Sequence, residues 1–443
     1  MSMLARRSIR RNARCILADG LYSALVVYLT PTVVDTFVRE CRHVFRERLY
    51  PPLMVLWGMI SQALSNDSSD RAAIHRLAGW FGRDLSPASG SYCKARKHLP
   101  LALLEAATRY VAAITAPCDL PLGKRRVFVL DGSAVTLADT DENQQLYPQP
   151  SIQKPGCGFP VLRFVALMDH ATGCIVEMLF GSLHIHEARL ARPLWDRLHK
   201  GDILLADRGF AGYGLLAALV ARGVDVVIRQ HYRRKNATPF SGPVDDKLEW
   251  WPCPGKTLDW WGIEGPERLR VRVIRKTLPD GSVLILNTTL DAKRYPAAIL
   301  CDLYRSRWRV ETMFGDLKTT LGLDETYPKM PATAHRRIWA HALAYNLMCC
   351  LLADVAAKHN VPRNRLSLKG AADALTAGLG LRVTTLLEAW EWVADRVARD
   401  LLPDRPDRIE PRALKRRPKP FSWLTKHRRL LKNDPNARGR RKR

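Results

Sequence analysis

The chain of 443 residues lacks several patterns that would assign it to a common class of protein. Its ten cysteines include no CxxC pair, which is typical of core thiols in a reducing cytoplasm. No segment reaches the 18 uninterrupted apolar residues of a membrane span, so we expect no membrane partner. The letters "PGKT" at 254–257 resemble a P-loop, but that motif requires glycine at 250, where Trp250 stands. A nucleotide-binding loop is therefore excluded.

Acidic residues are scarce relative to basic ones. The sequence has 43 Asp and Glu against 70 Lys and Arg, which gives a formal net charge of +27. Such an excess predicts a polyanionic partner, and nucleic acid is the commonest one. Residues 412–443 hold 14 Lys or Arg and one acidic residue. Two interpretations stay open for this tail, a solvated segment and a contact with the DNA backbone.

The chain is long enough for several hydrophobic cores, and the pattern of its apolar and polar residues changes along its length. We predict an α/β fold in five parts, from the spacing of apolar residues and from turn signals. These are a helical region at 1–118, an α/β region at 119–230, antiparallel β-strands inserted at 231–298, a second part of the α/β domain at 299–385, and a helical, basic region at 386–443. Within 119–230, "VLRFVALMDHATGCIVEMLFGS" predicts two strands around a turn, and residues 203–228 predict a βαβ unit.

Two short apolar runs end in aspartate. "VFVL" stops at Asp131 and "ILLA" stops at Asp207. If both runs are strands of one α/β sheet, the two carboxylates lie at strand carboxyl ends, where such sheets place their active sites. Either aspartate alone is more often a turn or helix-capping residue, so the pair requires a third member.

The segment "LYRSRWRVETMFGDLKTTLG" at 303–322 supplies a candidate. On a helix with about 100° per residue, Tyr304, Arg307, Glu311 and Lys318 share an arc of about 60°. The apolar residues fall beside that arc, which predicts that the polar face borders a buried stripe. The apolar residues are Leu303, Val310, Met313, Phe314, Leu317 and Leu321. Arg305, Arg309 and Asp316 are expected on the solvated side.

Glu311 is then a candidate third carboxylate, flanked by groups that suit phosphate. A few carboxylates can hold two Mg²⁺ ions for an in-line phosphoryl displacement, and Arg and Lys orient the phosphates. His184 and His186 form an HxH beside Glu187, which is an alternative metal site. Without a further ligand pattern, hydrogen-bonded histidines are the better interpretation of this pair.

The spacing of Tyr304, Arg307, Glu311 and Lys318 resembles the Y-R-E-K signature of the insertion-sequence family four (IS4-type) transposases. "VLDGS" and "DILLADRGFAGY" resemble the two aspartate blocks of that family, and "GSYCKARKHLP", "PGCGFP", "HALAYNL" and "RLSLKGA" are similar to its other motifs. The resemblance extends from about residue 45 to 420. One departure is the serine of "DGS", Ser133, where threonine is usual.

The resemblance implies a DDE transposase with a ribonuclease H-like catalytic domain, an N-terminal DNA-binding region, and Asp131, Asp207 and Glu311 as catalytic and metal-binding residues. It implies two Mg²⁺ ions, with Mn²⁺ as a substitute, terminal inverted repeats and target DNA as partners, a homodimer in the synaptic complex, and action at the bacterial nucleoid. Tyr304, Arg307 and Lys318 would hold DNA phosphates. A tryptophan of the inserted strands, one of Trp250, Trp251, Trp260 and Trp261, would stack on a flipped base, although each could equally be core.

The function implied is cleavage of the ends of an insertion sequence and joining of the freed 3′-hydroxyls to target DNA. A decayed transposase that binds DNA without catalysis is the alternative. A nuclease of the same fold that never joins strands is a further possibility, because hydrolysis and strand transfer use one metal site.

Overall fold

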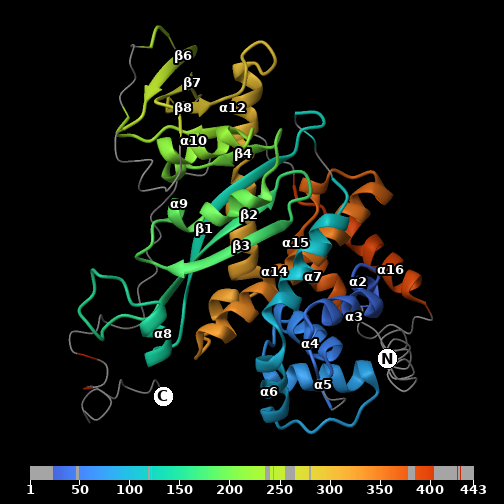
Figure 1. The fold of residues 1–443 in the computed structure, drawn as a ribbon. Coiled ribbons are helices and arrows are strands. Elements are labelled where there is room, and N and C mark those ends of the chain that lie inside the picture. The colour runs from blue at the N-terminus through green and yellow to red at the C-terminus, as the bar shows by residue number, and fades with distance from the viewer. Residues whose placement is uncertain are drawn as a thin grey trace.

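The chain has a mixed α/β fold, in which helices pack around one eight-stranded sheet (Figure 1). The computed structural model describes residues 23–45, 49–117, 120, 122–234, 240–242, 244–254, 265–278, 281–377, 385–403, 427 and 430. The strands are β1 (Val127–Thr136), β2 (Val161–Asp169), β3 (Ile175–Ser182), β4 (Ile203–Ala206), β5 (Asp225–Arg229), β6 (Val244–Pro252), β7 (Arg268–Thr277) and β8 (Val283–Thr288). Their order across the sheet is β3-β2-β1-β4-β5-β8-β7-β6.

Three adjacent strands in the middle of the sheet are parallel, and the remaining neighbours are antiparallel. β4 pairs in parallel with both β1 and β5. The predicted hairpin of β2 and β3 and the predicted βαβ unit of β4, helix α10 (Tyr213–Ala221) and β5 are confirmed. The strands β6, β7 and β8 are antiparallel, and β8 pairs with β5, so they extend the central sheet rather than forming a second one.

Each face of the sheet is covered by its own hydrophobic layer. Alternate residues of a strand point to opposite faces, and in β1 Val127 and Val129 join one core while Phe128 and Leu130 join the other. The second core contains α9 (Glu187–Leu190), α10 and the 3₁₀ turns η1 (Arg192–Arg197) and η2 (Arg208–Phe210). The first core contains the N-terminal helices and the helices that follow the sheet.

The N-terminal helices are α2 (Ser23–Val26), α3 (Pro31–Glu40), α4 (Pro52–Leu64), α5 (Asp70–Phe81), α6 (Gly90–His98) and α7 (Leu101–Ile114). Their ends follow ordinary capping rules. The Ser69 hydroxyl accepts a hydrogen bond from the backbone N–H of Ala72 at the start of α5, and Gly82 ends that helix at φ +55°. The short helix α8 (Asp141–Leu146) follows β1.

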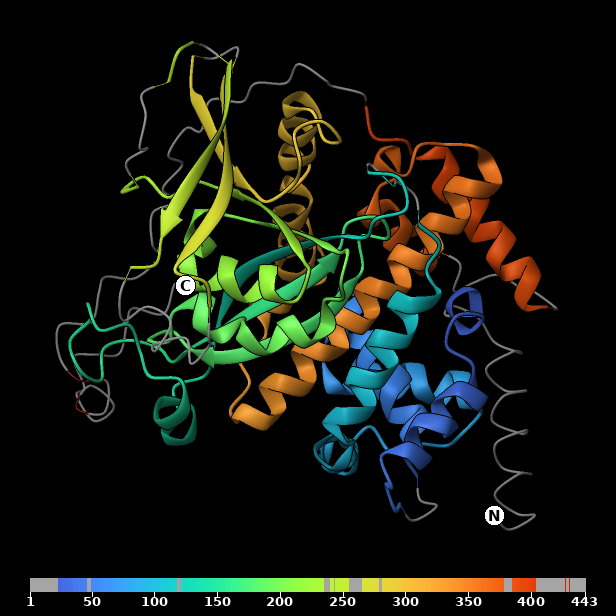
Figure 2. The ribbon, with the colours of Figure 1, turned by 45° about the horizontal axis from the view of Figure 1, so that its top comes forward.

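After β8 come α12 (Ala297–Arg305), α13 (Trp308–Gly315), the π-turn η3 (Asp316–Thr320), the 3₁₀ turn η4 (Leu323–Glu325), α14 (Pro331–His359), the 3₁₀ turn η5 (Arg363–Arg365), α15 (Leu368–Ala377) and α16 (Leu386–Arg399). The helix α14 passes between the sheet and the N-terminal helices (Figure 2). Among the described residues it is the one helix long and apolar enough to cross a membrane, and 94% of its apolar window is buried inside the molecule. This placement makes α14 a core helix.

The buried side chain of Asn346 in α14 joins three elements. Its amide nitrogen donates to the carbonyl oxygens of Thr108 in α7 and Ile175 in β3, and its oxygen accepts from the N–H of Ile175. An amide without exposed surface needs such partners, because burying it without hydrogen bonds costs free energy. The N-terminal helices and the sheet are therefore tied through one residue.

Candidate active site

One row of residues across the three parallel strands is polar. The strands align Leu130 with Ala206 and Ala206 with Ile228. The next row therefore contains Asp131, Asp207 and Arg229. The residues two positions earlier in these strands face the hydrophobic layer that contains α12 and α13; they are Val129, Leu205 and Val227. Because residues two apart in a strand point to the same face, the polar row faces this layer too.

The expectation that β1 ends at Asp131 is wrong. The strand continues to Thr136, because the residues from Asp131 to Thr136 pair with β2 from Ala166 to Val161. What ends at Leu130 is the parallel pairing with β4. Asp207, by contrast, directly follows its strand, and its carboxylate caps η2 by accepting from the N–H of Gly209 at 2.7 Å.

The segment 303–322 is not one continuous helix, as the angular projection assumed. The α-helix is interrupted at Ser306 and Arg307, between α12 and α13, and it changes to a π-turn at Asp316. At the interruption, His170 Nε2 lies 2.6 Å from the Ser306 hydroxyl, which in turn donates to the carbonyl of Leu303. A tertiary contact from the β2–β3 turn therefore accompanies the interruption.

The predicted buried stripe of this segment is confirmed despite the interruptions. Leu303, Val310, Met313, Phe314, Leu317 and Leu321 are all buried. Arg305 and Arg309 are exposed as expected. Asp316 is different: it is half-buried, its carboxylate accepts from the Thr320 hydroxyl, and burial raises its pKa. The solvated position expected for Asp316 is therefore wrong, because its side chain is half-buried and bonded to Thr320.

Arg307 connects two of the three candidate carboxylates. Its Nη1 lies 2.9 Å from Asp131 Oδ2, and its Nη2 lies 2.8 Å from Glu311 Oε1. Asp131 comes from β1 and Glu311 from α13, and the two residues are 180 positions apart in the sequence. Both bonds are charge-assisted, and such bonds are stronger than neutral ones. This guanidinium fixes α13 against the polar row of the sheet.

Tyr304 lies beside this bridge, and Lys318 makes no contact with it. Tyr304 is buried, and the Arg307 guanidinium carbon lies 5.9 Å from the centre of its ring. Burial raises the pKa of Tyr304, while Arg307 and Arg229 lower it and Asp207 raises it further. Lys318 is half-buried on η3 and forms no hydrogen bond or ion pair to any residue the structure describes.

Burial dominates the electrostatics of Asp131. Burial raises the pKa of this carboxyl to about 6, Asp207 and Glu187 add to the rise, and the Gly132 N–H and Arg307 oppose it. Burial alone would lower the pKa of Arg307, but Tyr304, Asp131 and Glu311 outweigh it, and the pKa is raised. Asp131 is therefore hard to ionise even with a guanidinium attached.

This donor set fits a divalent cation chemically. Carboxylate oxygens are the ligands that Mg²⁺ prefers, and a bound cation would favour the charged form of a carboxyl whose pKa is raised by burial. Within the described part of the chain, no three His, Cys, Asp or Glu side chains converge as a finished metal cage. Glu311 is joined to the site through Arg307 rather than directly.

One residue near the site, Arg229, is not among the candidates that the sequence predicts. Arg229 ends the third parallel strand, and its signal was its place at the end of "VDVVIR", in register with Asp207. Glu187 lies on the opposite face, where its carboxyl carbon is 2.6 Å from the position that a Cβ on Gly132 would take. A side chain at Gly132 would therefore displace the Glu187 carboxylate, whereas Ser133 lies half-buried in β1.

The described tryptophans of the β6–β8 region have different surroundings. Trp250 is 63% exposed, whereas Trp251 is 2% exposed and belongs to the core. The Arg234 guanidinium carbon lies 3.4 Å from the centre of the Trp251 ring. Trp260, Trp261, residues 1–22 and nearly all of the basic tail lie outside the described residues.

The HxH pair is engaged in local hydrogen bonds. His186 caps α9 by accepting from the N–H of Ala188, and His184 Nε2 lies 3.2 Å from the carbonyl oxygen of Gln149. These contacts agree with the interpretation of hydrogen-bonded histidines. No disulfide joins any of the eight described cysteines.

Comparisons with known proteins show which proteins this chain is similar to. Residues 122–347 match the family described as "Transposase DDE domain". Transposase InsG for insertion sequence element IS4 of Escherichia coli (strain K12) is 24% identical over 94% of this chain and 96% of its own length. Putative transposase InsL for element IS186A of the same strain is 37% identical over 48% of this chain and 66% of its own. Among solved structures, the piggyBac transposase synaptic complex with hairpin DNA is 10% identical over 86% of this chain and 85% of that chain, with a TM-score of 0.45.

The family profile covers the sheet, the polar row and the Tyr304–Lys318 segment together. The chain therefore belongs to the DDE transposases. Its activity is that of a DNA transposase.

Proposed function

We propose that Asp131, Asp207 and Glu311 are the catalytic triad of this transposase, on a ribonuclease H-like domain. The order β3-β2-β1-β4-β5 with three central parallel strands supports that fold. In this interpretation β6, β7 and β8 are an insertion between β5 and α12. The observation that carries the proposal is the Arg307 bridge, which brings Glu311 to the polar row that holds both aspartates.

The three carboxylates would hold two Mg²⁺ ions, with Mn²⁺ as a substitute. When bound, the ions would neutralise the carboxylates and polarise the phosphoryl oxygens. The chain's own contribution is placement: β1 and β4 fix the two aspartates in the same row of the sheet, and α13 fixes the glutamate. The pKa of about 6 at Asp131 keeps part of this carboxyl protonated until positive charge arrives.

The basic and aromatic residues beside the triad would position the DNA. Arg307 has five N–H donors, of which two are used for the carboxylate bridge, so others can reach a phosphate oxygen. Lys318 has a free ammonium within the described structure, and Tyr304 offers a phenolic hydroxyl. Of the described tryptophans, Trp250 presents an exposed ring that could stack on an unpaired base.

The reaction that this arrangement supports is cleavage at the ends of an insertion sequence, followed by attack of the freed 3′-hydroxyl on a target strand. The substrates would be terminal inverted repeats and target DNA, bound by a homodimer in the synaptic complex. The bacterial relatives support action at the nucleoid in the cytoplasm. The N-terminal helices would contribute DNA contacts.

The test is the variant Glu311→Gln, assayed in Mg²⁺ on a duplex that carries the element's own end. We expect end binding to persist and cleavage to disappear, because the amide keeps the shape and hydrogen bond but loses the charge. Retained cleavage would contradict the triad. If the wild-type protein binds ends without nicking them, the alternative of a decayed, non-catalytic transposase is correct, and nicking without joined product would indicate a nuclease.

A further inference from the structure

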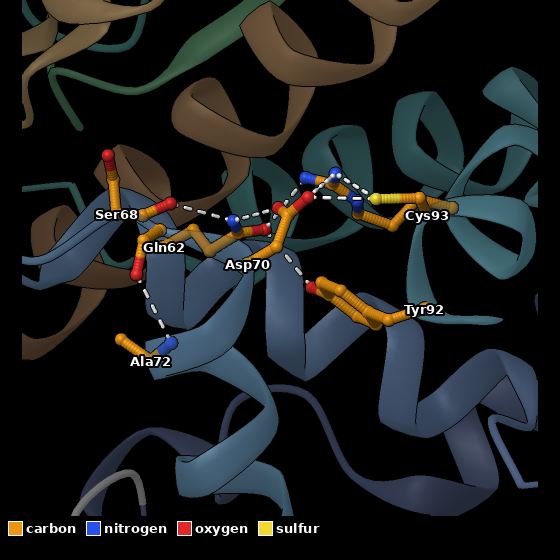
Figure 3. A network of polar contacts seen from close by, with 8 residues as sticks. Gln62, Ser68, Asp70, Ala72, Tyr92 and Cys93 are labelled. Carbon is orange, nitrogen blue, oxygen red and sulfur yellow. Dashed lines mark hydrogen bonds and ion pairs between the residues drawn. The ribbon is translucent and has the colours of Figure 1, made fainter. Parts of the chain in front are cut away.

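A buried polar network lies among α4, α5 and α6, on the opposite side of α14 from the sheet. Figure 3 shows Gln62, Asp70, Tyr92 and Cys93 converging. The Arg96 guanidinium is held from two sides: Nη2 lies 2.8 Å from Asp70 Oδ2, and Nη1 donates to Gln62 Oε1 at 3.1 Å. Tyr92 donates to the same Gln62 oxygen, and Cys93 Sγ lies 2.9 Å from Asp70. The network fixes the direction of Arg96.

Next to this network is a cavity of about 220 Å³ between α6 and the first two turns of α14. It is several times larger than the volume of one water molecule, which is about 30 Å³. Its lining residues are Met59, Cys93, Arg96, Lys97, Thr333, Arg336 and Arg337. Four of the seven carry positive charge, and none is acidic.

The positive charge of this cavity is poorly compensated. Asp70 is the carboxylate that faces Arg337, and it is already bonded to Arg96. Arg336 uses Nε and Nη1 on the carbonyl oxygens of Leu99 and Ala332. The guanidinium of Arg337 has no hydrogen-bond acceptor among the described residues. Burial lowers its pKa, and the nearby Arg96 lowers it further.

A further donor in the same place lacks an acceptor. The Nε of Arg96 is buried and has no hydrogen-bond partner within the described structure. Buried charges are normally paired, because an unpaired one loses its hydration without return. The N-terminal end of a long helix adds the positive end of its dipole, and Thr333 in the first turn of α14 adds a hydroxyl. These groups together favour a bound anion.

We propose that this cavity binds a phosphate group. The cavity size, the cluster of guanidinium donors and the ammonium of Lys97 suit a tetrahedral oxyanion, which Arg recognises through paired N–H donors. The source we infer is the backbone of duplex DNA, and this choice of source rests on the proposed function. The pocket would add a contact outside the Asp131 site, formed jointly by α6 and α14.

The experiment uses the full chain and measures how its affinity for a mixed-sequence 30-base-pair duplex depends on salt. Each phosphate contact adds about one unit to the slope of log affinity against log salt. We expect Lys97→Gln and Arg337→Gln each to weaken binding and to reduce the slope by about one. Lys94→Gln is the matched control, because Lys94 is exposed on α6 but does not line the cavity.

A second arm distinguishes the source of the phosphate. The thermal unfolding midpoint is measured in inorganic phosphate and in chloride at equal ionic strength. Stabilisation of the wild type by phosphate, lost in Arg337→Gln, together with unchanged duplex slopes would assign the pocket to free phosphate. Unchanged slopes with no phosphate-specific stabilisation would overturn the proposal. Lys97→Gln keeps the test valid if Arg337→Gln folds poorly, because Lys97 is exposed.

Failure of the pocket and failure of the proposed function give different results. If the wild type does not bind or cleave ends, the proposed function is wrong, and the inorganic phosphate arm still tests the cavity. If the wild type cleaves ends but both variants behave like Lys94→Gln, only the pocket is wrong.

Discussion

At the scale of single residues, the structure gives Arg307 a different role from basic residues that look equivalent to it in the sequence. The segment 303–322 contains several basic side chains, but among the three arginines Arg307 alone contacts candidate triad carboxylates, while Arg305 and Arg309 are exposed. Helical spacing predicted which of them faces inward. It could not predict the partner Asp131, because that contact depends on how α13 lies on the sheet.

Replacing Arg307 with Gln should destabilise the protein by about 1 to 3 kcal/mol, because it removes two charge-assisted hydrogen bonds and leaves Asp131 with less compensation. The measurement is the free energy of unfolding in denaturant. Arg305→Gln on neighbouring α12 is the control, and a surface change of this kind stays within about 0.5 kcal/mol. Equal effects of the two variants would show that the bridge does not stabilise the fold.

The pKa of Asp131 predicts a pH dependence of the metal-free protein. Its folded-state pKa is about 6 against the ordinary 3.8, so between these values the folded state binds more protons than the unfolded state. Stability therefore falls as pH rises through this window, by up to about 3 kcal/mol. Denaturation at pH 4 and pH 6.5 measures it, and Asp131→Asn should remove this component. A wild-type profile that matches Asp131→Asn would contradict the raised pKa.

At the scale of elements, the hydrophobic pattern of 303–322 predicted the buried stripe but not the interruptions. Leu303, Val310 and Leu317 are buried because apolar periodicity is local information. The interruption at Ser306 involves His170, which is 136 positions away in sequence, and no local rule includes it. Likewise, β1 continues past Asp131 because of its pairing with β2, which depends on tertiary structure.

The adjacent tryptophans of β6 should respond oppositely to truncation. Trp251→Ala should lower the free energy of unfolding by about 3 to 5 kcal/mol, because the Trp251 ring is buried and the Arg234 guanidinium packs on it. Trp250→Ala should change stability by less than about 0.5 kcal/mol, because its ring is exposed. Denaturant unfolding measures both values.

The same pair tests base stacking. In Trp250→Ala the loss of one stacked base is worth about 1 to 3 kcal/mol in binding to single-stranded DNA, measured by titration of a labelled oligonucleotide. Unchanged affinity would remove Trp250 from the DNA interface.

At the scale of the whole molecule, the order of helical, α/β, antiparallel and helical segments was readable from apolar spacing and turn signals. The continuity of the sheet was not, because the pairing of β8 with β5 joins residues about 60 positions apart. The polar row of Asp131, Asp207 and Arg229 depends on register, which a single sequence does not specify. The five-part division stays a prediction.

Asn346 offers a test of how the N-terminal helices are joined to the sheet. Asn346→Leu keeps a similar volume but leaves the N–H and carbonyl of Ile175 and the carbonyl of Thr108 without their bonds. We expect a loss of about 2 to 4 kcal/mol in unfolding free energy, because several buried polar groups lose partners. A variant as stable as the wild type would show that these groups find other partners.

If the polar row and Glu311 form one catalytic centre, the substitution Asp207→Asn should inactivate it. An amide oxygen can still cap η2 at Gly209, so the fold should persist, while one negative charge of the proposed triad is lost. Asp302→Asn, on the exposed side of α12, is the matched control. In Mg²⁺ we expect Asp207→Asn to bind the element's ends but neither to cleave nor to join them, while the control does both. Cleavage by Asp207→Asn at the wild-type rate would contradict it.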